Sequence, residues 1–460
     1  MITLIALLGF WCLATWGFVS RKPILIYVFF ASLPFGSFAV IPTQISAGLT
    51  FTATPIIAIL IIVRILASQK GLNFLVLNAW DAKRLGLLFL FWIAAIFATI
   101  FMPRLFAGTI EVIPVRGILS QTSLLRPTTQ NISQLAYLTI SVFATFAFTR
   151  ALHADSAKYI SFRALCGGAI LVVTTGLIDY ASTYLPTKFI LEPFRTASYS
   201  LLTDVEVLGG KRVVGLMPEA SSYGGLCLVF LATLFFLRDQ VRETGIPTLL
   251  VTLLLLGLCV CLWLSKSTGA YVGLGVFALF ATMNWGTNFI AGRSNPITFK
   301  IRIHEFWAVF MLCFGIILFA IVQPSIFDPI VELVDRMVLQ KGSSSSFEER
   351  GYWRAVSWQA ALDSYGFGVG LGGTRASSSI VSIISNTGFL GAILYFSFVL
   401  ITMFGRIDTQ VLSLKKIANG VRWAFLANFV LGYFIGTADF GLFAAFQFGL
   451  ISSIRNREIR

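Results

Sequence analysis

The sequence contains a short segment in which basic, acidic and aromatic side chains gather at the start of an apolar run. Lys211 and Arg212 come first, Pro218 and Glu219 follow, and Tyr223 lies four residues further on. Pro218 suits the first turn of a helix, so Glu219 should lie beside the positive end of that helix dipole. A carboxylate there can act as a general base, and the neighbouring cations can bind an anion. A plain helix-start acid is the alternative, and we favour a functional role because so many polar groups converge.

A second group of candidate residues lies on a predicted amphipathic helix over residues 347–364. Arg350, Arg354 and Trp358 are four residues apart and share one face, whereas Trp353 belongs to another stripe. Two guanidinium groups beside an indole can bind phosphate and stack on a sugar ring. The same face also fits an interfacial helix whose Trp and Arg side chains lie among lipid headgroups. The sequence leaves these two interpretations equally open.

A glycine-rich stretch over residues 366–373 follows this helix and ends close to Arg375. Its glycines, Gly370 and Gly372 among them, permit close approach of the backbone. A turn of this kind before the next helix can present backbone N–H groups to an anion, with Arg375 closing the turn. Because no strand precedes it, the stretch is not a dinucleotide-binding motif.

Two more charged residues are candidates because of their position in apolar sequence. Lys266 lies in a minimal turn between two apolar runs, where it serves either as a headgroup anchor or as an anion ligand. Asp179 lies in the outer part of an apolar run, and an acid at such depth is a functional candidate by default.

The composition indicates that a membrane surrounds these residues. Hydrophobic residues make up 57% of the 460 residues and charged residues only 12%, and the mean hydropathy is +0.86. A soluble protein this apolar could not cover its surface with polar groups, and the absence of low-complexity sequence excludes disorder. We therefore predict an all-α polytopic membrane protein with a single integral membrane domain over residues 1–460, since lipid offers no partner for open backbone groups.

The apolar runs predict about 12–13 transmembrane helices at roughly 20 residues each. The last two runs are short and meet at residues 437–439, so the smaller count makes them one re-entrant pair. The runs cover residues 3–19, 24–41, 51–67, 85–102, 132–149, 165–185, 219–237, 247–264, 269–285, 306–323, 379–404, 421–436 and 440–454.

The net charge of +14 is distributed unevenly over the connections between these runs. One alternating set of connections holds 21 of the 34 basic and 7 of the 20 acidic residues, whereas the other set is neutral. The positive-inside rule makes the first set cytoplasmic. The excess charge therefore reports membrane orientation, and it does not indicate a nucleic-acid partner.

The long outer connections carry most of the candidate residues. They cover residues 103–131, 186–218 and 324–378, and the last of these is the longest. Loops this long inside a compact domain are usually functional. We expect them on the periplasmic face of a bacterial inner (cytoplasmic) membrane, and we expect the chemistry to take place there.

Three stretches together resemble the superfamily of O-antigen polymerases and O-antigen ligases. They are Arg212–Tyr223, Ser265–Ala270 and Glu349–Gly391. The resemblance covers about residues 205–395, and the preceding part of the chain matches in hydropathy alone. The order and combination of the stretches carry the resemblance, together with many helices and two major periplasmic loops.

The resemblance implies a C-type glycosyltransferase that needs no nucleotide and takes a glycan from undecaprenyl pyrophosphate. A polymerase transfers the growing chain to the next lipid-linked repeat unit, and a ligase transfers it to lipid A–core. Arg212 and Arg350 fall where the superfamily places arginines, ahead of a Gly and of a Trp respectively. Ligases typically carry a His after the glycine stretch, but the only histidines here are His153 and His304, on the cytoplasmic side. This departure favours a polymerase of an exopolysaccharide, capsule or O-antigen.

We therefore expect an enzyme whose substrate is already activated, because the sequence has no phosphate-binding loop, paired carboxylates or metal-ligand cluster. No cofactor and no metal are expected. Arg212, Arg350 and Arg375 are expected to be catalytic by stabilising the pyrophosphate leaving group, and Glu219 is the expected general base. The expected substrate-binding residues are Lys211, Tyr223, Lys266, Arg354, Trp358, Gly370, Gly372 and Asp179.

The expected partners are the lipid-linked oligosaccharide donor and acceptor, membrane lipids, a chain-length regulator and a flippase. A flippase for the same lipid-linked sugars is also the competing class for this chain, since it would share the hydropathy and the internal arginines. Transporters usually contain internal repeats and helices broken near mid-membrane. The halves of this sequence show no convincing repeat and the charges gather in outer loops, so we favour the enzyme.

Overall fold

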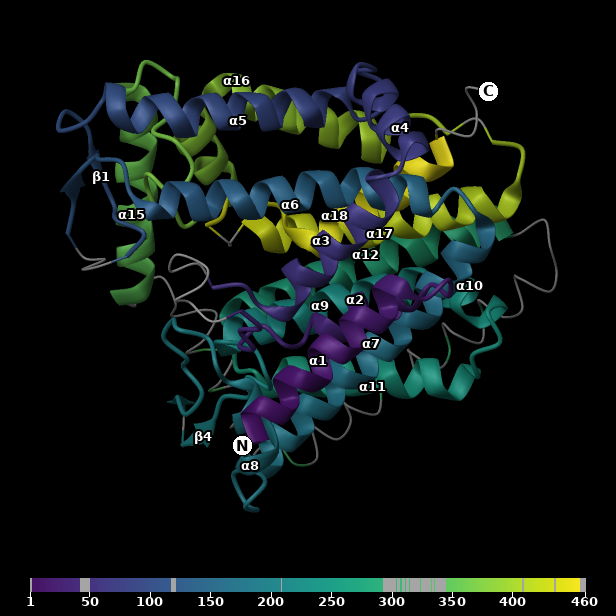
Figure 1. Cartoon of the computed structure of the whole chain (residues 1–460). Coiled ribbons are helices and arrows are strands. Elements are labelled where there is room, and N and C mark those ends of the chain that lie inside the picture. Colours follow the sequence, from purple (N-terminus) through teal and green to yellow (C-terminus); the bar gives the residue numbers. More distant parts are fainter. Residues whose placement is uncertain are drawn as a thin grey trace.

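The computed structural model of this chain is mostly helical, with two small hairpins as the only sheets among the residues it describes. These are residues 2–41, 50–116, 121–207, 209–292, 345–407, 409–433 and 436–455, with isolated positions between 303 and 335. Figure 1 shows long helices lying side by side across the molecule, with short elements and loops gathered at their two ends.

A helix is present at each predicted apolar run that lies within the described residues. The predicted run 306–323 falls almost entirely outside them. The long helices are α1 (Ile2–Val19), α2 (Ile24–Ser32), α3 (Ala53–Leu66), α5 (Gly86–Leu105), α6 (Thr129–Ala151), α7 (Asp155–Ala181), α9 (Ala220–Phe236), α11 (Thr248–Leu264), α12 (Thr268–Gly292), α16 (Ser379–Phe404), α17 (Leu412–Tyr433) and α18 (Gly441–Arg455).

Several of these helices are suited to a membrane by length and composition. In the described part of the chain, five are long and apolar enough to cross one, namely α1, α5, α6, α7 and α16. Helix α3 continues into α4 (Gln69–Ala79) after a bend of 99°, and this pair would be a sixth span. Helices α9, α11 and α18 are apolar but shorter. The helical class is confirmed and fits a membrane-embedded protein, whereas the count of 12–13 spans stays a prediction.

The helices share one continuous core that is rich in phenylalanine. Helix α18 packs along α6, α16 along α5, and α2 along α7. Phe148 meets Phe29 and Phe446 edge to face, with ring centroids 5.0 and 5.7 Å apart. This geometry suits the charge distribution of aromatic rings. A Cβ added at Gly449 would lie 2.5 Å from the Cβ of Phe148, so glycine allows α18 and α6 to approach closely.

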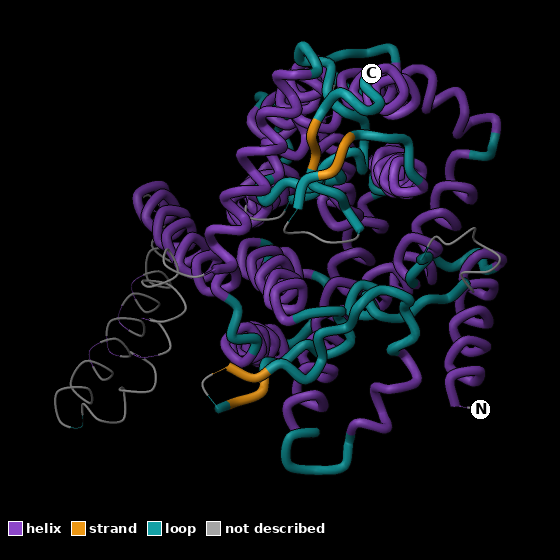
Figure 2. Tube along the Cα trace, turned by 90° about the vertical axis from the view of Figure 1, so that its left-hand side faces the viewer, coloured by secondary structure: helices purple, strands orange, loops and turns teal. Residues whose placement is uncertain are grey.

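The two ends of the bundle are formed by the two sets of connections that the charge pattern separates. One end contains the antiparallel hairpins β1 (Glu111–Val112) with β2 (Ser123–Leu124) and β3 (Glu206–Val207) with β4 (Gly210–Lys211), and the helices α8 (Lys188–Leu191), η1 (Glu192–Phe194) and α15 (Ser345–Asp363). The other end contains α4, α10 (Arg238–Glu243) and the end of α18 (Figure 1). Figure 2 views the first end, with both hairpins toward the reader. The described parts of the expected outer loops therefore gather at one end of the molecule.

Candidate functional site

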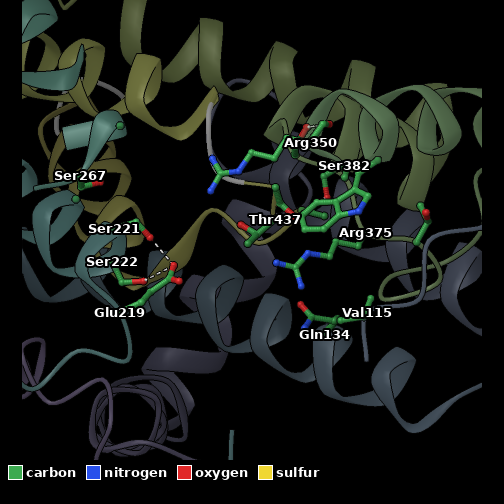
Figure 3. Close-up of a pocket in the computed structure, with 18 of the residues that line it drawn as sticks. Val115, Gln134, Glu219, Ser221, Ser222, Ser267, Arg350, Arg375, Ser382 and Thr437 are labelled. Carbon is green, nitrogen blue, oxygen red and sulfur yellow. Dashed lines mark hydrogen bonds between the residues drawn. The ribbon is translucent and has the colours of Figure 1, made fainter. Parts of the chain in front are cut away.

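A cavity of about 570 Å³ lies among these outer loops and the helix ends beneath them (Figure 3). The four residues expected to be catalytic, Arg212, Glu219, Arg350 and Arg375, all line it. They come from segments far apart in the chain, so the fold brings them together. The polar lining also includes Gln134, Ser221, Ser222, Ser267, Asn386 and Thr437.

Glu219 is held by hydroxyl groups instead of capping its helix. It directly precedes α9, its backbone is extended with φ −152° and ψ 161°, and its carboxylate caps no backbone N–H. The Oε1 atom accepts hydrogen bonds from Ser221 Oγ and, at 3.5 Å, from Ser222 Oγ. Among the residues that the structure describes, this carboxylate forms no ion pair. It therefore keeps lone pairs for a group that enters the cavity.

Arg212 is half-buried in a segment that is fastened to the turn after α11. The N–H of Val213 donates to Leu264 O at 3.1 Å, and Arg212 Nε donates to Ser265 O at 3.4 Å. Burial lowers the pKa of Arg212, and the charge of Glu219 opposes that shift. A guanidinium group that has lost part of its water binds an anion more strongly than an exposed one does.

Arg375 is fixed through its backbone and stacked on an indole. Its N–H donates to Ile113 O at 3.0 Å, and its carbonyl accepts from Ser357 Oγ at 3.0 Å. Its guanidinium carbon lies 4.4 Å from the ring centroid of Trp353, within the range of a cation–π contact. The fork of Arg375 is therefore held in place before any ligand binds, which is the condition for strong recognition of an anion.

The charged groups of the described lining are three guanidinium groups and one carboxylate. Figure 3 shows Glu219 on one wall, and Arg350 and Arg375 on the wall across from it. Burial lowers the pKa of Arg375, the charge of Glu219 raises it, and the charge of Arg350 lowers it. Arg375 is half-buried and Arg350 is exposed. Two cations that repel each other are stabilised when an anion enters between them. The arginine wall is therefore suited to a negatively charged substrate group.

Asp179 and Lys211 lie outside this lining, in a buried ion cluster. Asp179 Oδ1 lies 3.0 Å from Arg195 Nη2 and 2.8 Å from Lys211 Nζ. Its Oδ2 accepts from the backbone N–H groups of Val214 and Gly215, at 2.8 and 3.1 Å. These contacts fasten the end of α7 to the loop before α9. Both residues are expected to bind substrate, and the structure places them in internal contacts outside the lining of the cavity.

Tyr223 and Lys266 also make internal contacts and do not line the cavity. Tyr223 is fully buried, and its hydroxyl donates to Val172 O at 2.8 Å. Lys266 has a φ of 43°, and its Nζ donates to Val207 O at 2.8 Å, in the β3–β4 hairpin. Burial lowers the pKa of Lys266. Both residues are expected to bind substrate, and the structure places them outside the lining, whereas Ser267, next to Lys266, does line the cavity.

Helix α15 forms where the sequence predicts it but presents a different face. It lies across the end of the bundle (Figure 1) and packs on α16 and β1. Trp353 and Ala360 are buried, whereas Arg354 and Trp358 are exposed. Arg350 shares the cavity with Trp353 and not with the stripe that continues through Arg354 and Trp358. Of the three residues of the predicted stripe, Arg350 lines the cavity, whereas Arg354 and Trp358 lie outside its lining.

The two candidate glycines have different surroundings. Gly372 lines the cavity with a φ of 72°, and a Cβ there would lie 2.7 Å from Gln130 O. Gly370 has a φ of 81°, but it packs against α5, where a Cβ would lie 2.8 Å from Pro103 Cγ. Both positions require glycine, and only Gly372 is placed to meet a ligand.

The sequence reasoning missed the side chains that orient the charged groups. Ser221 and Ser222 hold the carboxylate before α9, and Trp353 supports a guanidinium group. The signal for the serines was their position in the first turn, directly after a helix-start acid. The signal for Asn386 was a polar residue inside an apolar run, which marks function more often than packing.

No family model matches the sequence, and a search of curated proteins finds no match either. In the described ranges, no three or more His, Cys, Asp or Glu side chains are grouped so that they could hold a metal ion. The functional assignment therefore depends on the residues of the cavity themselves.

Proposed function

We propose that the chain is a polysaccharide polymerase of the O-antigen polymerase type, acting at the periplasmic face of a bacterial inner membrane. The observation that carries the proposal is one cavity that combines Glu219 with Arg212, Arg350 and Arg375 at the loop end of an apolar helical bundle. Transfer of a glycan from a lipid pyrophosphate requires such a set, namely a base for the acceptor hydroxyl and cations for the leaving group.

In the proposed reaction, the glycan passes from undecaprenyl pyrophosphate to a sugar hydroxyl of the next lipid-linked repeat unit. Glu219 takes the proton of that hydroxyl, and the hydroxyl oxygen forms a bond to the anomeric carbon of the donor. The bond from this carbon to the pyrophosphate oxygen breaks, and the pyrophosphate leaves with the electron pair. Arg350 and Arg375 stabilise the added negative charge, and Arg212 extends the positive surface toward Glu219.

The cavity volume fits the reacting groups of such substrates and not a whole polymer. Pockets of roughly 300–1,000 Å³ hold small ligands, and 570 Å³ lies within that range. The pyrophosphate and a few sugar rings would occupy the cavity, while the lipid tail and the remaining polymer lie outside it. The hydrogen bonds of Ser221 and Ser222 to Glu219 would keep the base in register with the acceptor hydroxyl.

Two other functions compete with this proposal. A ligase would use the same donor with lipid A–core as the acceptor. A flippase would move the lipid-linked unit without forming a bond, and transporters often contain broken helices. Helix α16 is broken at Gly388, but the glycine-rich loop fills this break, with Phe389 N–H donating to Gly366 O at 2.9 Å. A break that the protein itself occupies favours a fixed wall over a moving gate.

The deciding experiment places the full-length protein in lipid nanodiscs with lipid-linked repeat units extracted from a strain that lacks its gene. A polymerase converts these units alone into longer lipid-linked chains. A ligase transfers glycan only after lipid A–core is added, and a flippase lengthens nothing in either reaction. The absence of longer chains from the units alone would exclude the polymerase.

A further inference from the structure

The part of the cavity wall that α16 forms ends at an interruption of this helix, and the glycine-rich loop packs against the interruption. Gly388 has φ 74° and ψ 175° inside the helix, and a Cβ there would lie 2.6 Å from Gly366 O. Besides the bond at this carbonyl, Val369 N–H donates to Ser385 O at 2.7 Å. The glycine-rich loop and the helix therefore fix each other. Asn386 lies two residues before the break and is held within this rigid junction.

The amide group of Asn386 has a defined orientation. Its Nδ2 donates to Ser382 O at 2.8 Å, to Ser385 Oγ at 3.3 Å and to Thr374 O at 3.4 Å. Two of these partners are carbonyl oxygens, which only accept hydrogen bonds, so the nitrogen must be the atom that faces them. The amide nitrogen is thus anchored in the wall, and the oxygen is the group left to interact.

The oxygen of this amide has no hydrogen-bond partner among the described residues. Asn386 is 2% exposed and lines the cavity, and its Oδ1 is buried. Buried polar atoms in folded proteins are nearly always paired, and exceptions occur where a ligand supplies the partner. An amide oxygen needs a donor, so the matching ligand group is a hydroxyl or an amide N–H and not a phosphate.

The position of Asn386 indicates which part of the substrate reaches it. Its anchor Thr374 directly precedes Arg375, and Ser382, one turn before it, lies on the same wall as Arg350 and Arg375 in Figure 3. Glu219 is on the wall across from them. A sugar beside Asn386 is therefore next to the proposed pyrophosphate site and away from the proposed base.

We propose that Asn386 Oδ1 accepts a hydrogen bond from a hydroxyl or acetamido N–H of the donor sugar that is joined to the pyrophosphate, and so selects that sugar. This inference rests on the proposed polymerase function. A site that pairs a substrate donor group with a buried acceptor rejects analogues that lack the group, because the acceptor is then left unpaired.

The first test compares Asn386→Ala with Ser378→Ala in the nanodisc reaction on extracted lipid-linked repeat units. Ser378 precedes α16, its Oγ is also buried with no hydrogen-bond partner in the described part of the chain, and it does not line the cavity, so it is a matched control. We expect kcat/KM to fall about tenfold to a hundredfold in Asn386→Ala, as for loss of one buried hydrogen bond to substrate. The control should stay close to the wild-type value. Wild-type kcat/KM in Asn386→Ala would overturn the inference.

A second test separates recognition from a structural role. It uses synthetic donors in which each hydroxyl or acetamido group of the first sugar is replaced in turn by hydrogen. The wild-type protein should discriminate about tenfold or more against one of these donors, whereas Asn386→Ala should use that donor and its parent alike. Equal discrimination by both proteins would overturn the inference.

The two proposals fail in different ways. If the wild-type protein extends no lipid-linked unit, the polymerase proposal is wrong and this inference is wrong with it. If Glu219→Gln is inactive while Asn386→Ala retains wild-type kcat/KM on every donor, the polymerase stands and the inference alone is wrong.

Discussion

Asp179 and Glu219 lie at the same end of the helix bundle, one near the end of α7 and the other directly before α9. The Asp179 side chain is 1% exposed, and two cations and two backbone N–H groups occupy its oxygens. Among the described residues, the Glu219 carboxylate has serine hydroxyls as its hydrogen-bond partners, and it faces Arg375 across a cavity. Both acids stand out in the sequence for the same reason, since each is a charge in or beside an apolar run.

These two acids differ in whether their carboxylate oxygens are occupied by contacts within the protein or are free to meet a substrate. The oxygens of Asp179 are occupied by contacts that hold two segments together, so its charge serves the architecture. The oxygens of Glu219 can accept a proton from an incoming hydroxyl, and nearby guanidinium groups can hold the leaving anion. A carboxylate that is fully paired therefore indicates structure, and one that is partly paired at a cavity indicates chemistry.

The largest effect is expected from Glu219→Gln, which keeps the shape of the side chain and removes the base. The rate of chain extension should fall about 10²–10⁴-fold, the usual contribution of a positioned base, while binding of the lipid-linked donor is retained. Initial rates and donor binding of the purified variant measure both. His153→Ala, at the other end of the bundle, is the control and should remain active. Full activity of Glu219→Gln would reduce this acid to a structural role like that of Asp179.

Arg375→Ala should have the next largest effect, because it removes one stabiliser of the leaving group. The extension rate should fall about 10²–10³-fold. Arg375→Lys should recover part of the rate, since lysine keeps the charge but loses the fork geometry. Arg354→Ala, an exposed arginine on α15, is the matched control. Equal losses in Arg354→Ala and Arg375→Ala would move the anion site out of the cavity.

Asp179→Ala should act on stability and leave the chemistry intact. It removes the acidic partner of the buried Lys211 and leaves Arg195 with Glu192 alone, and breaking a buried pair in this way costs about 3–5 kcal/mol. Thermal unfolding of the purified protein should show the loss, and the molecules that remain folded should extend chains at close to the wild-type rate. Unchanged stability would show that the cluster does not hold α7 to its loop.

Tyr223→Phe should have the smallest effect. It removes one buried hydrogen bond, to Val172 O, and should cost about 1 kcal/mol of stability. Extension by the folded protein should not change, because this hydroxyl does not line the cavity. A large loss of extension rate at unchanged stability would show that Tyr223 takes part in the reaction site.

Much of the helical fold could be predicted from the hydrophobic runs. In a membrane the N–H and C=O groups of the backbone must form hydrogen bonds with each other, so a hydrophobic run marks a helix. Helix α4 is the instructive exception, since it follows α3 at a sharp bend and begins at Gln69. Its polar start resembles a short cytoplasmic connection. The capping signal was nevertheless present, because Ser68 Oγ accepts from Gly71 N–H at 3.1 Å.

The residue types of the candidate site could be predicted from the sequence, but the contacts between its residues could not. Sequence spacing placed Arg350 and Trp358 on one stripe of α15, yet it cannot say which stripe faces the protein, and the structure buries Trp353 instead. In the same way, nothing near Asp179 in the sequence reveals that Arg195 and Lys211 will neutralise it. Such partners are brought into contact by tertiary packing, which local sequence patterns do not specify.

The most direct test of the central claim measures chain extension per folded molecule for Glu219→Gln and Asp179→Ala side by side, in nanodiscs with the same lipid-linked units. We expect Glu219→Gln to be as stable as the wild-type protein but at least about 10²-fold slower. We expect Asp179→Ala to be less stable but to extend chains at close to the wild-type rate. An inactive Asp179→Ala of wild-type stability beside a fully active Glu219→Gln would instead place the chemistry at the ion cluster.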